Sequence, residues 1–168
     1  MTDEEARSRL LAVDLGERRI GIAVGDAGTR TAVPLTTLSR APTPAHDARV
    51  LARLAAEQRA GCLIVGLPFN DDGSEGPQAA ATRDWAAVVA AESGLPLRFH
   101  DERLTSQRAE RRIGGPARGR SGGPPGHAQR EAHRARIDRE AAALILQDYF
   151  DSMAAAEQAA AENAEDSE

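Results

Sequence analysis

The sequence predicts an α/β fold, in which one mixed sheet carries helices on both of its faces. Three strand-like segments open the chain and follow one another through short connections, which is typical of antiparallel pairing. Further along, strand-like segments alternate with helical ones, which indicates parallel strands joined by crossover helices. At 168 residues, of which 41% are hydrophobic, the chain is long enough for one domain with an ample core.

The N-terminal part of the chain contains three predicted strands and one helix. Residues 9–15 and 19–25 are both apolar and strand-like, and the three residues between them suit a tight antiparallel hairpin. Pro34 lies in the third strand, 32–38, and places that strand at a sheet edge or a bulge, because proline cannot donate a backbone hydrogen bond. Apolar residues then recur at helical spacing over 46–60, which predicts a helix.

The C-terminal part alternates between strands and helices. The run CLIVGL at 62–67 is apolar throughout, which is typical of a strand covered on both faces. A long helix over 77–92 should follow, since proline suits the first helical turn. The remaining predicted elements are a strand at 95–100, a helix at 105–113 and a final helix at 129–153.

These elements define one predicted domain, residues 9–152, between two tails. Residues 1–8 form a short N-terminal tail, and residues 114–127 are too rich in glycine and proline for regular structure. Residues 153–168 consist mostly of alanine and acidic residues, so we expect a frayed helix or a disordered tail.

Charge is distributed unevenly along the chain. The formal net charge is −5, yet residues 98–139 contain 11 arginines against 5 acidic residues. Residues 148–168 contain 7 acidic residues and no arginine. A local excess of arginine is typical of a surface that binds phosphate groups, so the overall negative charge does not exclude a nucleic-acid partner.

The single cysteine and the N-terminus indicate the cellular compartment. Cys62 excludes an intramolecular disulfide and a thiolate zinc cluster, and its place in an apolar strand predicts a buried, unreactive thiol. The first residues are polar and acidic, unlike a secretory signal, and no apolar run approaches the roughly 20 residues that span a bilayer. We therefore expect a cytoplasmic protein with no membrane partner.

A carboxylate interrupts the first strand. Asp14 lies inside the apolar run LAVDLGERRIGIAV, where an unpaired buried charge costs several kcal/mol. In a sheet of the predicted kind, Asp14 can converge with Asp101 or Glu102, after the strand 95–100, and with Asp138 in the final helix. Such carboxylates repel one another unless a cation lies between them, and Mg²⁺ or Mn²⁺ prefers oxygen ligands. Spacing alone leaves ordinary turn, loop and helix roles open for each acid.

Four blocks of the sequence together resemble the YqgF/RuvX family. They are VDLGERRIGIAVGD, IVGLPFNDDGSEGP, HDERLT and RIDREAAALILQDYF, and they cover residues 10–151 in the family's order. The resemblance implies an RNase H-like sheet, with acids at the first strand, the DER motif and the last helix. Asp14, Glu102 and Asp138 match those catalytic and metal-binding positions. Asp101 stays open as the alternative to Glu102, because neighbouring strand residues face opposite sides. Glu17 departs from the small or hydroxyl residue usual in the family.

Arginines near these acids are candidates for binding nucleic acid. Arg103 lies beside the acids and has the planar fork that suits phosphate oxygens, although an ion pair with Asp101 or Asp138 is the alternative. Aromatic residues make up 3% of the chain, so binding should depend on backbone and shape more than on base stacking. The remaining candidates for a backbone-binding track are Arg111, Arg112, Arg118, Arg120, Arg134 and Arg136.

These observations predict a nuclease that depends on Mg²⁺ or Mn²⁺ and hydrolyses phosphodiester bonds with water as the nucleophile. The resemblance implies structured RNA as the partner, with processing of the 5′ end of pre-16S rRNA as the reaction. The alternatives are a Holliday junction resolvase acting on branched DNA, generally as a dimer, and a non-catalytic RNA-binding assembly factor. A sugar-kinase-like or actin-like ATPase would need two such domains. The sequence leaves open RNA or DNA, endo- or exonucleolytic cleavage, the metal and the oligomeric state.

Overall fold

Five strands form one mixed sheet in the computed structural model, which describes residues 9–165 except 71, 103–104 and 117–123. The strand order is β3-β2-β1-β4-β5, in which β1, β2 and β3 pair antiparallel and β1, β4 and β5 pair parallel. This arrangement confirms the predicted mixed sheet of five strands. The strands are β1 (Arg9–Leu15), β2 (Arg19–Asp26), β3 (Thr31–Ser39), β4 (Cys62–Leu67) and β5 (Leu97–Asp101).

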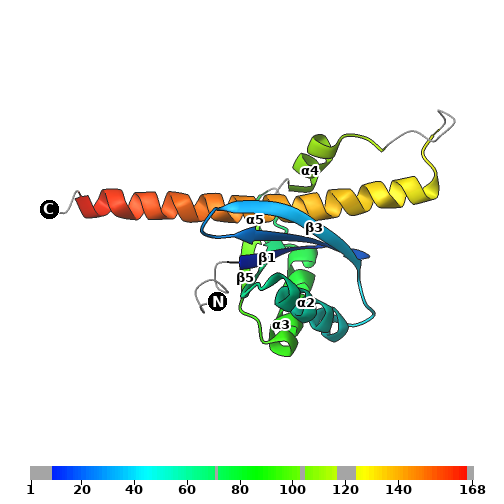
Figure 1. The fold of residues 1–168 in the computed structure, drawn as a ribbon, viewed down its shortest axis with the longest axis horizontal. Coiled ribbons are helices and arrows are strands. Elements are labelled where there is room, and N and C mark those ends of the chain that lie inside the picture. The colour runs from blue at the N-terminus through cyan, green and yellow to red at the C-terminus, as the bar shows by residue number, and fades with distance from the viewer. Residues whose placement is uncertain (1–8, 71, 103–104, 117–123, 166–168) are drawn as a thin grey trace.

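Helices cover both faces of the sheet (Figure 1). One face carries α2 (Pro44–Gln58) and α3 (Pro77–Ser93), whose buried side chains join those of the sheet in the larger hydrophobic cluster. The long helix α5 (His127–Glu165) crosses the other face, and α4 (Thr105–Ile113) packs against α5. The domain therefore has three layers, with the sheet in the middle.

Alternation along β1 decides which face each of its side chains joins. Leu11, Val13 and Leu15 belong to the cluster with α2 and α3, whereas Leu10 and Ala12 belong to the cluster with α5. Because successive strand residues point to opposite faces, Asp14 continues the series on the α5 side. The predicted carboxylate of the first strand thus lies beneath α5.

Small residues on β2 let α5 approach the sheet closely. A Cβ atom on Gly25 would lie 2.7 Å from Phe150 and 2.8 Å from Leu146, both of which are α5 side chains. A Cβ atom on Gly21 would lie 2.0 Å from the backbone oxygen of Asp138. Glycine at these two positions therefore fixes how near the helix lies to the strand.

Most predicted boundaries agree with the structure, with small differences that have local causes. Pro34 lies on the edge strand β3, next to an irregularity in its pairing with β2, as predicted. Helix α2 begins before the predicted range, because Thr43 caps it by accepting a hydrogen bond from the backbone of His46. Helix α2 also ends earlier, because Arg59 takes a left-handed conformation.

The final helix is longer than the predicted 129–153. It continues to Glu165, so residues 153–165 follow the helical alternative expected for the tail. The side chains described beyond 154 are exposed, which agrees with the lack of core-forming residues there. No helix among the described residues is long and apolar enough to cross a membrane.

Two single side chains show how the core is built at its margins. Trp85 lies in the core, and its indole nitrogen donates a hydrogen bond to Asp47 at 2.9 Å. The sequence predicts a buried Cys62, but this residue is only partly buried, because it is the first residue of β4 and lines a cavity of about 380 Å³. Burial nevertheless raises the pKa of the Cys62 thiol, which agrees with the expected low reactivity.

Candidate active site

Two of the predicted acids meet on the α5 side of the sheet. Asp14 lies near the carboxyl end of β1, and Glu102 directly follows β5. Their side chains are hydrogen-bonded to each other. A Cβ atom on Gly66 would lie 2.1 Å from Glu102 Oε2 and 2.5 Å from Ile145 of α5, so glycine leaves the space that the Glu102 carboxyl group occupies. Of the two neighbouring acids, Glu102 is the one that reaches Asp14.

The environment of this pair favours the neutral forms. Burial raises the pKa of Asp14 to about 7, and the negative charge of Asp138 contributes in the same direction. Burial also raises the pKa of Glu102 to about 8, helped by the charge of Asp14 and, more weakly, of Asp101. The mutual repulsion of the two acids adds to the effect of burial, and a cation between them would relieve that repulsion.

The third acid, Asp138, lies on α5 above the neighbouring strand. Gly21 is the cross-strand partner of Asp14, and the backbone of Asp138 passes directly over Gly21. The side chain of Asp138 accepts a hydrogen bond from Arg19 Nε at 2.5 Å. This contact raises the pKa of Arg19, and Arg19 Nη1 also donates to Glu131 Oε2 at 3.2 Å. Asp138 is thus near enough to act on Asp14 by its charge, while its carboxylate is held by an arginine.

The residues present suit a hard divalent cation in chemistry, although they do not yet enclose one. In the part of the chain that the structure describes, no three histidine, cysteine or acidic side chains lie close enough together to hold a metal ion. Asp14, Glu102 and Asp138 nevertheless supply carboxylate oxygens, which Mg²⁺ and Mn²⁺ prefer. Asp14 and Glu102 are half-buried, and a bound cation would compensate the charge that their environment disfavours. The donor set fits, provided that Asp138 turns away from Arg19.

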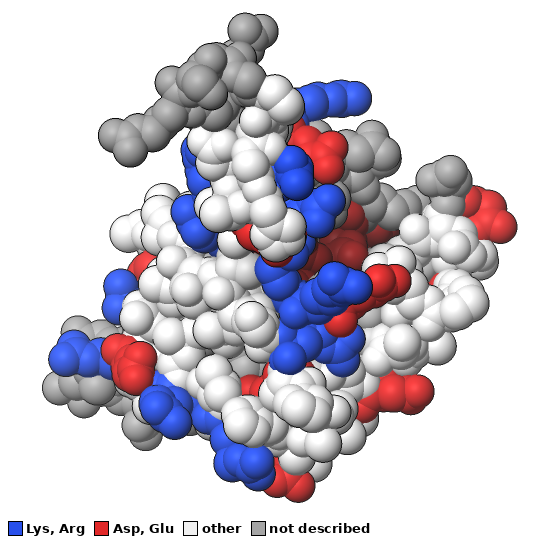
Figure 2. Space-filling view, turned by 90° about the vertical axis from the view of Figure 1, so that its right-hand side faces the viewer, with Lys and Arg blue, Asp and Glu red and all other residues white. Residues whose placement is uncertain are grey.

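A cleft of about 410 Å³ opens beside Asp138. Its walls are the turn between β1 and β2, at residues 16–19, and three α5 side chains. Arginine side chains gather on this face around a recess in which acidic side chains are visible (Figure 2). The cleft therefore combines carboxylates with cationic groups suited to phosphate. The α5 residues that line it are Glu131, Arg134 and Asp138.

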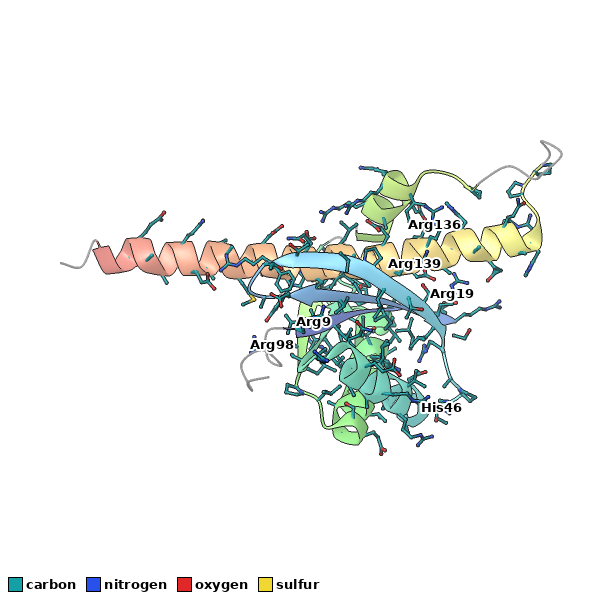
Figure 3. All side chains as sticks on the ribbon, in the orientation of Figure 1. Arg9, Arg19, His46, Arg98, Arg136 and Arg139 are labelled. Carbon is teal, nitrogen blue, oxygen red and sulfur yellow. The ribbon has the colours of Figure 1, made fainter. Side chains whose placement is uncertain are left out.

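The structure brings only some of the predicted phosphate-binding arginines to this cleft. Arg134 lines it, whereas Arg136 lies on α5 where α4 approaches (Figure 3). Arg111 and Arg112 lie on α4, and Arg112 forms an ion pair of 3.0 Å with Glu140. Three predicted positions lie outside the described residues: Arg103, Arg118 and Arg120.

The sequence analysis missed two arginines that the structure places at the cleft. The sequence places Arg18 in the connection and Arg19 at the start of a hairpin strand, and both line the cleft. The sequence offers one signal, because Arg18 and Arg19 follow Asp14 by only four and five residues in the same block. What the sequence did not show is that the partner of Arg19, Asp138, comes from a helix 119 residues away.

Known proteins are similar to this chain over most of its length. The model of the RuvX family, described as Holliday junction resolvase, matches residues 8–152. A relative from Anaeromyxobacter sp. (strain K), named "Putative pre-16S rRNA nuclease", is 44% identical over 146 residues, which are 87% of this chain and 98% of the relative. A relative from Chloroflexus aggregans with the same name is 40% identical over 143 residues, covering 85% of this chain and 93% of that one.

Among solved structures, RuvC of T. thermophilus in complex with a Holliday junction substrate is similar at a TM-score of 0.47. It is 18% identical and covers 87% of this chain and 95% of that chain.

Proposed function

This chain belongs to the RuvX family, and from that membership we propose that it is a divalent-metal-dependent nuclease that hydrolyses phosphodiester bonds. The curated relatives, at 44% and 40% identity, favour the 5′ end of pre-16S rRNA as the substrate. A substrate of this kind would place the protein in the cytoplasm. Structured RNA is then the partner, and Mg²⁺ or Mn²⁺ the cofactor.

The observation that carries the proposal is that Asp14 interacts with acids from two other elements. Asp14 comes from β1, Glu102 follows β5 and Asp138 comes from α5, and both Glu102 and Asp138 influence the pKa of Asp14. Burying such a group is unfavourable unless a cation compensates it. We assign Asp14, Glu102 and Asp138 as metal ligands and keep Asp101 as an outer carboxylate that acts on Glu102 by its charge.

In the proposed mechanism each group has a separate task. Divalent metal held by the acids would activate water and stabilise the leaving oxygen of the phosphodiester. Partial burial beneath α5 limits the contact of Asp14 and Glu102 with bulk water, which strengthens their interaction with charge in the site. The arginines of the cleft, Arg18 and Arg134, would hold the backbone phosphates next to the scissile bond.

The direct test is cleavage by variants of the proposed ligands. Purified protein is incubated with pre-16S rRNA fragments, single-stranded RNA and DNA, and four-way DNA junctions, each with Mg²⁺ or Mn²⁺. Asp14→Asn and Asp138→Asn should each reduce the cleavage rate by more than ~100-fold, because each variant loses a proposed metal ligand. Loss of a group that only supports a ligand costs at most about that factor. Glu157→Gln is the matched control, because Glu157 pairs with Arg30 far along α5.

Circular dichroism and thermal unfolding show whether each variant is folded. Cleavage by folded Asp14→Asn and Asp138→Asn at the wild-type rate would refute the ligand assignment. Comparing Glu102→Gln with Asp101→Asn decides between the neighbouring acids, and we expect the larger loss for Glu102→Gln.

Two other functions remain as outcomes of the same panel. The family model is described as Holliday junction resolvase, and preferential cutting of four-way DNA by a dimer would favour that function. Full support of growth by Asp14→Asn in cells without the wild-type protein would favour a non-catalytic assembly factor.

A further inference from the structure

Arg19 is hydrogen-bonded to Asp138, which is one of the three proposed metal ligands. Its Nε atom lies 2.5 Å from Asp138 Oδ2, and its Nη1 atom lies 3.2 Å from Glu131 Oε2. The side chains of Arg19 and Asp138 are each only 25% exposed, so this is not an ordinary solvated surface pair. The contact spans the layers of the domain, from the start of β2 to α5.

The backbone around this contact is held in place, so only the side chains of Arg19 and Asp138 can move. The close approach of α5 to Gly21 fixes the height of Asp138 above the strand, because the helix backbone rests directly on the glycine. Asp138 can therefore change its partner by rotating its side chain, without a shift of the helix. The alternative partner is a cation near Asp14, because Asp138 lies directly over Gly21, the cross-strand partner of Asp14.

The guanidinium of Arg19 also has a second group that it could bind, a phosphate in the cleft. Arg19 lines the cleft of about 410 Å³ together with Arg18 and Arg134. Its planar fork of donors matches phosphate oxygens as well as carboxylate oxygens. An arginine that leaves Asp138 would therefore remain at the wall of the cleft where backbone phosphates are expected.

We propose that Arg19 is a positioning residue that holds Asp138 while the site is free of metal and transfers to a phosphate of the nucleic-acid backbone when a divalent cation takes Asp138. This inference rests on the proposed nuclease function. Arg19 thereby couples the two binding events: metal releases the arginine, and the released arginine adds a phosphate contact. It also weakens metal binding in the absence of nucleic acid, because the metal must displace it from Asp138.

The first test measures metal binding without any reaction. Mn²⁺ is titrated calorimetrically into the full chain, at one pH and ionic strength, for wild type and Arg19→Gln. The variant should bind Mn²⁺ roughly tenfold more tightly, since a hydrogen bond between charged groups changes an equilibrium by about that factor. A residue with a merely structural role would lower the affinity or leave it unchanged.

Two matched variants separate the ion pair from a general effect of charge. Arg30→Gln breaks another pair between an arginine and a carboxylate of α5, with Glu157, and should leave Mn²⁺ affinity at the wild-type value. Arg18→Gln removes a positive charge from the same cleft, and its effect should be smaller than that of Arg19→Gln. An increase of equal size in Arg18→Gln and Arg19→Gln would overturn the proposed role of the Asp138 contact.

The second test measures binding of a fluorescein-labelled single-stranded RNA by anisotropy, at low temperature and with gels to confirm that the RNA stays intact. Mn²⁺ should raise the affinity of the wild type more than that of Arg19→Gln. Arg19→Lys should restore part of the increase, because lysine retains the charge without the fork. If Arg19→Gln does not fold, the same comparison is made with Arg19→Lys, which should then bind Mn²⁺ more tightly than the wild type.

The outcomes distinguish this inference from the proposed function. Unchanged or weaker Mn²⁺ binding by folded Arg19→Gln, together with wild-type cleavage of RNA or DNA, would overturn the role of Arg19 and leave the nuclease intact. Failure of the wild type to cleave any substrate would contradict the function, while the comparison of Mn²⁺ affinities would still decide whether Arg19 competes with metal.

Discussion

Single residues decide where charge can be placed in this protein. Glycine at position 66 leaves the space that the Glu102 carboxyl group fills, and glycine at position 21 lets the backbone of Asp138 rest on β2. Both glycines act through space rather than through unusual backbone angles, because neither has a positive φ. The acids at the centre of the candidate site are therefore positioned by neighbours that have no side chain.

Gly66→Ala tests this positioning. The new Cβ atom would lie 2.1 Å from Glu102 Oε2 and 2.5 Å from the Ile145 side chain, so the carboxyl group must move. We expect Mn²⁺ affinity, measured by calorimetry, to fall about tenfold or more. Gly115→Ala is the control, because nothing lies within 4 Å of a Cβ atom there. Wild-type affinity in Gly66→Ala would mean that Glu102 does not bind the metal.

The pH dependence of stability tests the raised pKa values of Asp14 and Glu102. In the metal-free protein the pKa of Asp14 rises from 3.8 to about 7 and that of Glu102 from 4.5 to about 8. Between about pH 4 and 8 the folded state therefore binds more protons than the unfolded state, so the free energy of unfolding should decrease as pH rises. Urea denaturation in EDTA at several pH values measures this slope.

Asp14→Asn should make that slope shallower, because one of the two groups no longer titrates. Mn²⁺ should oppose the decrease, since ligands bind metal when they are deprotonated. A wild-type stability that increases from pH 5 to pH 8 in EDTA would contradict the described pair.

At the scale of elements, the layer formed by α2 and α3 depends on one buried carboxylate. Asp47 in the first turn of α2 is 3% exposed. It accepts hydrogen bonds from the indole nitrogen of Trp85 on α3, at 2.9 Å, and from the backbone nitrogen of Ala41, at 2.8 Å. A buried carboxylate with both oxygens satisfied can connect two helices without a cation. This acid is structural, in contrast to those beneath α5.

Asp47→Ala should destabilise the domain by about 2–4 kcal/mol, because two donors lose their acceptor and one of them is buried. Chemical denaturation measures the change, and Asp84→Ala, at an exposed position on the same helix as Trp85, is the control. A loss no larger than that of the control would show that water or another group replaces the Asp47 carboxylate.

At the scale of the whole molecule, the candidate site lies at one end of the sheet. The carboxyl ends of β1 and β5 carry Asp14 and Glu102, and the arginines of the cleft and of α4 surround that end (Figures 2 and 3). The protein has a net charge of −5, so the proposed nucleic-acid binding depends on this local arrangement rather than on total charge.

The salt dependence of RNA binding tests that arrangement. Replacing Arg134 and Arg136 together by glutamine should weaken binding and reduce the slope of log K against log salt by about 0.7 for each lost phosphate contact with a single strand. The control replaces Arg49 and Arg53, which are exposed on α2 in the other layer. Equal effects of the two double variants would indicate binding without a preferred face.

The sequence by itself determined the elements of this protein and the residue types at its candidate site. Local periodicity and turn residues predicted the five strands, the helices and the edge position of Pro34, because these features depend on near neighbours along the chain. The position of Asp14 in an apolar strand, with the family resemblance, identified the acids. Only the tertiary structure selected Glu102 rather than Asp101 as the partner of Asp14, and only it placed Arg19 on Asp138. Those contacts depend on the register of distant strands and on the approach of α5 to Gly21, which no short stretch of sequence encodes.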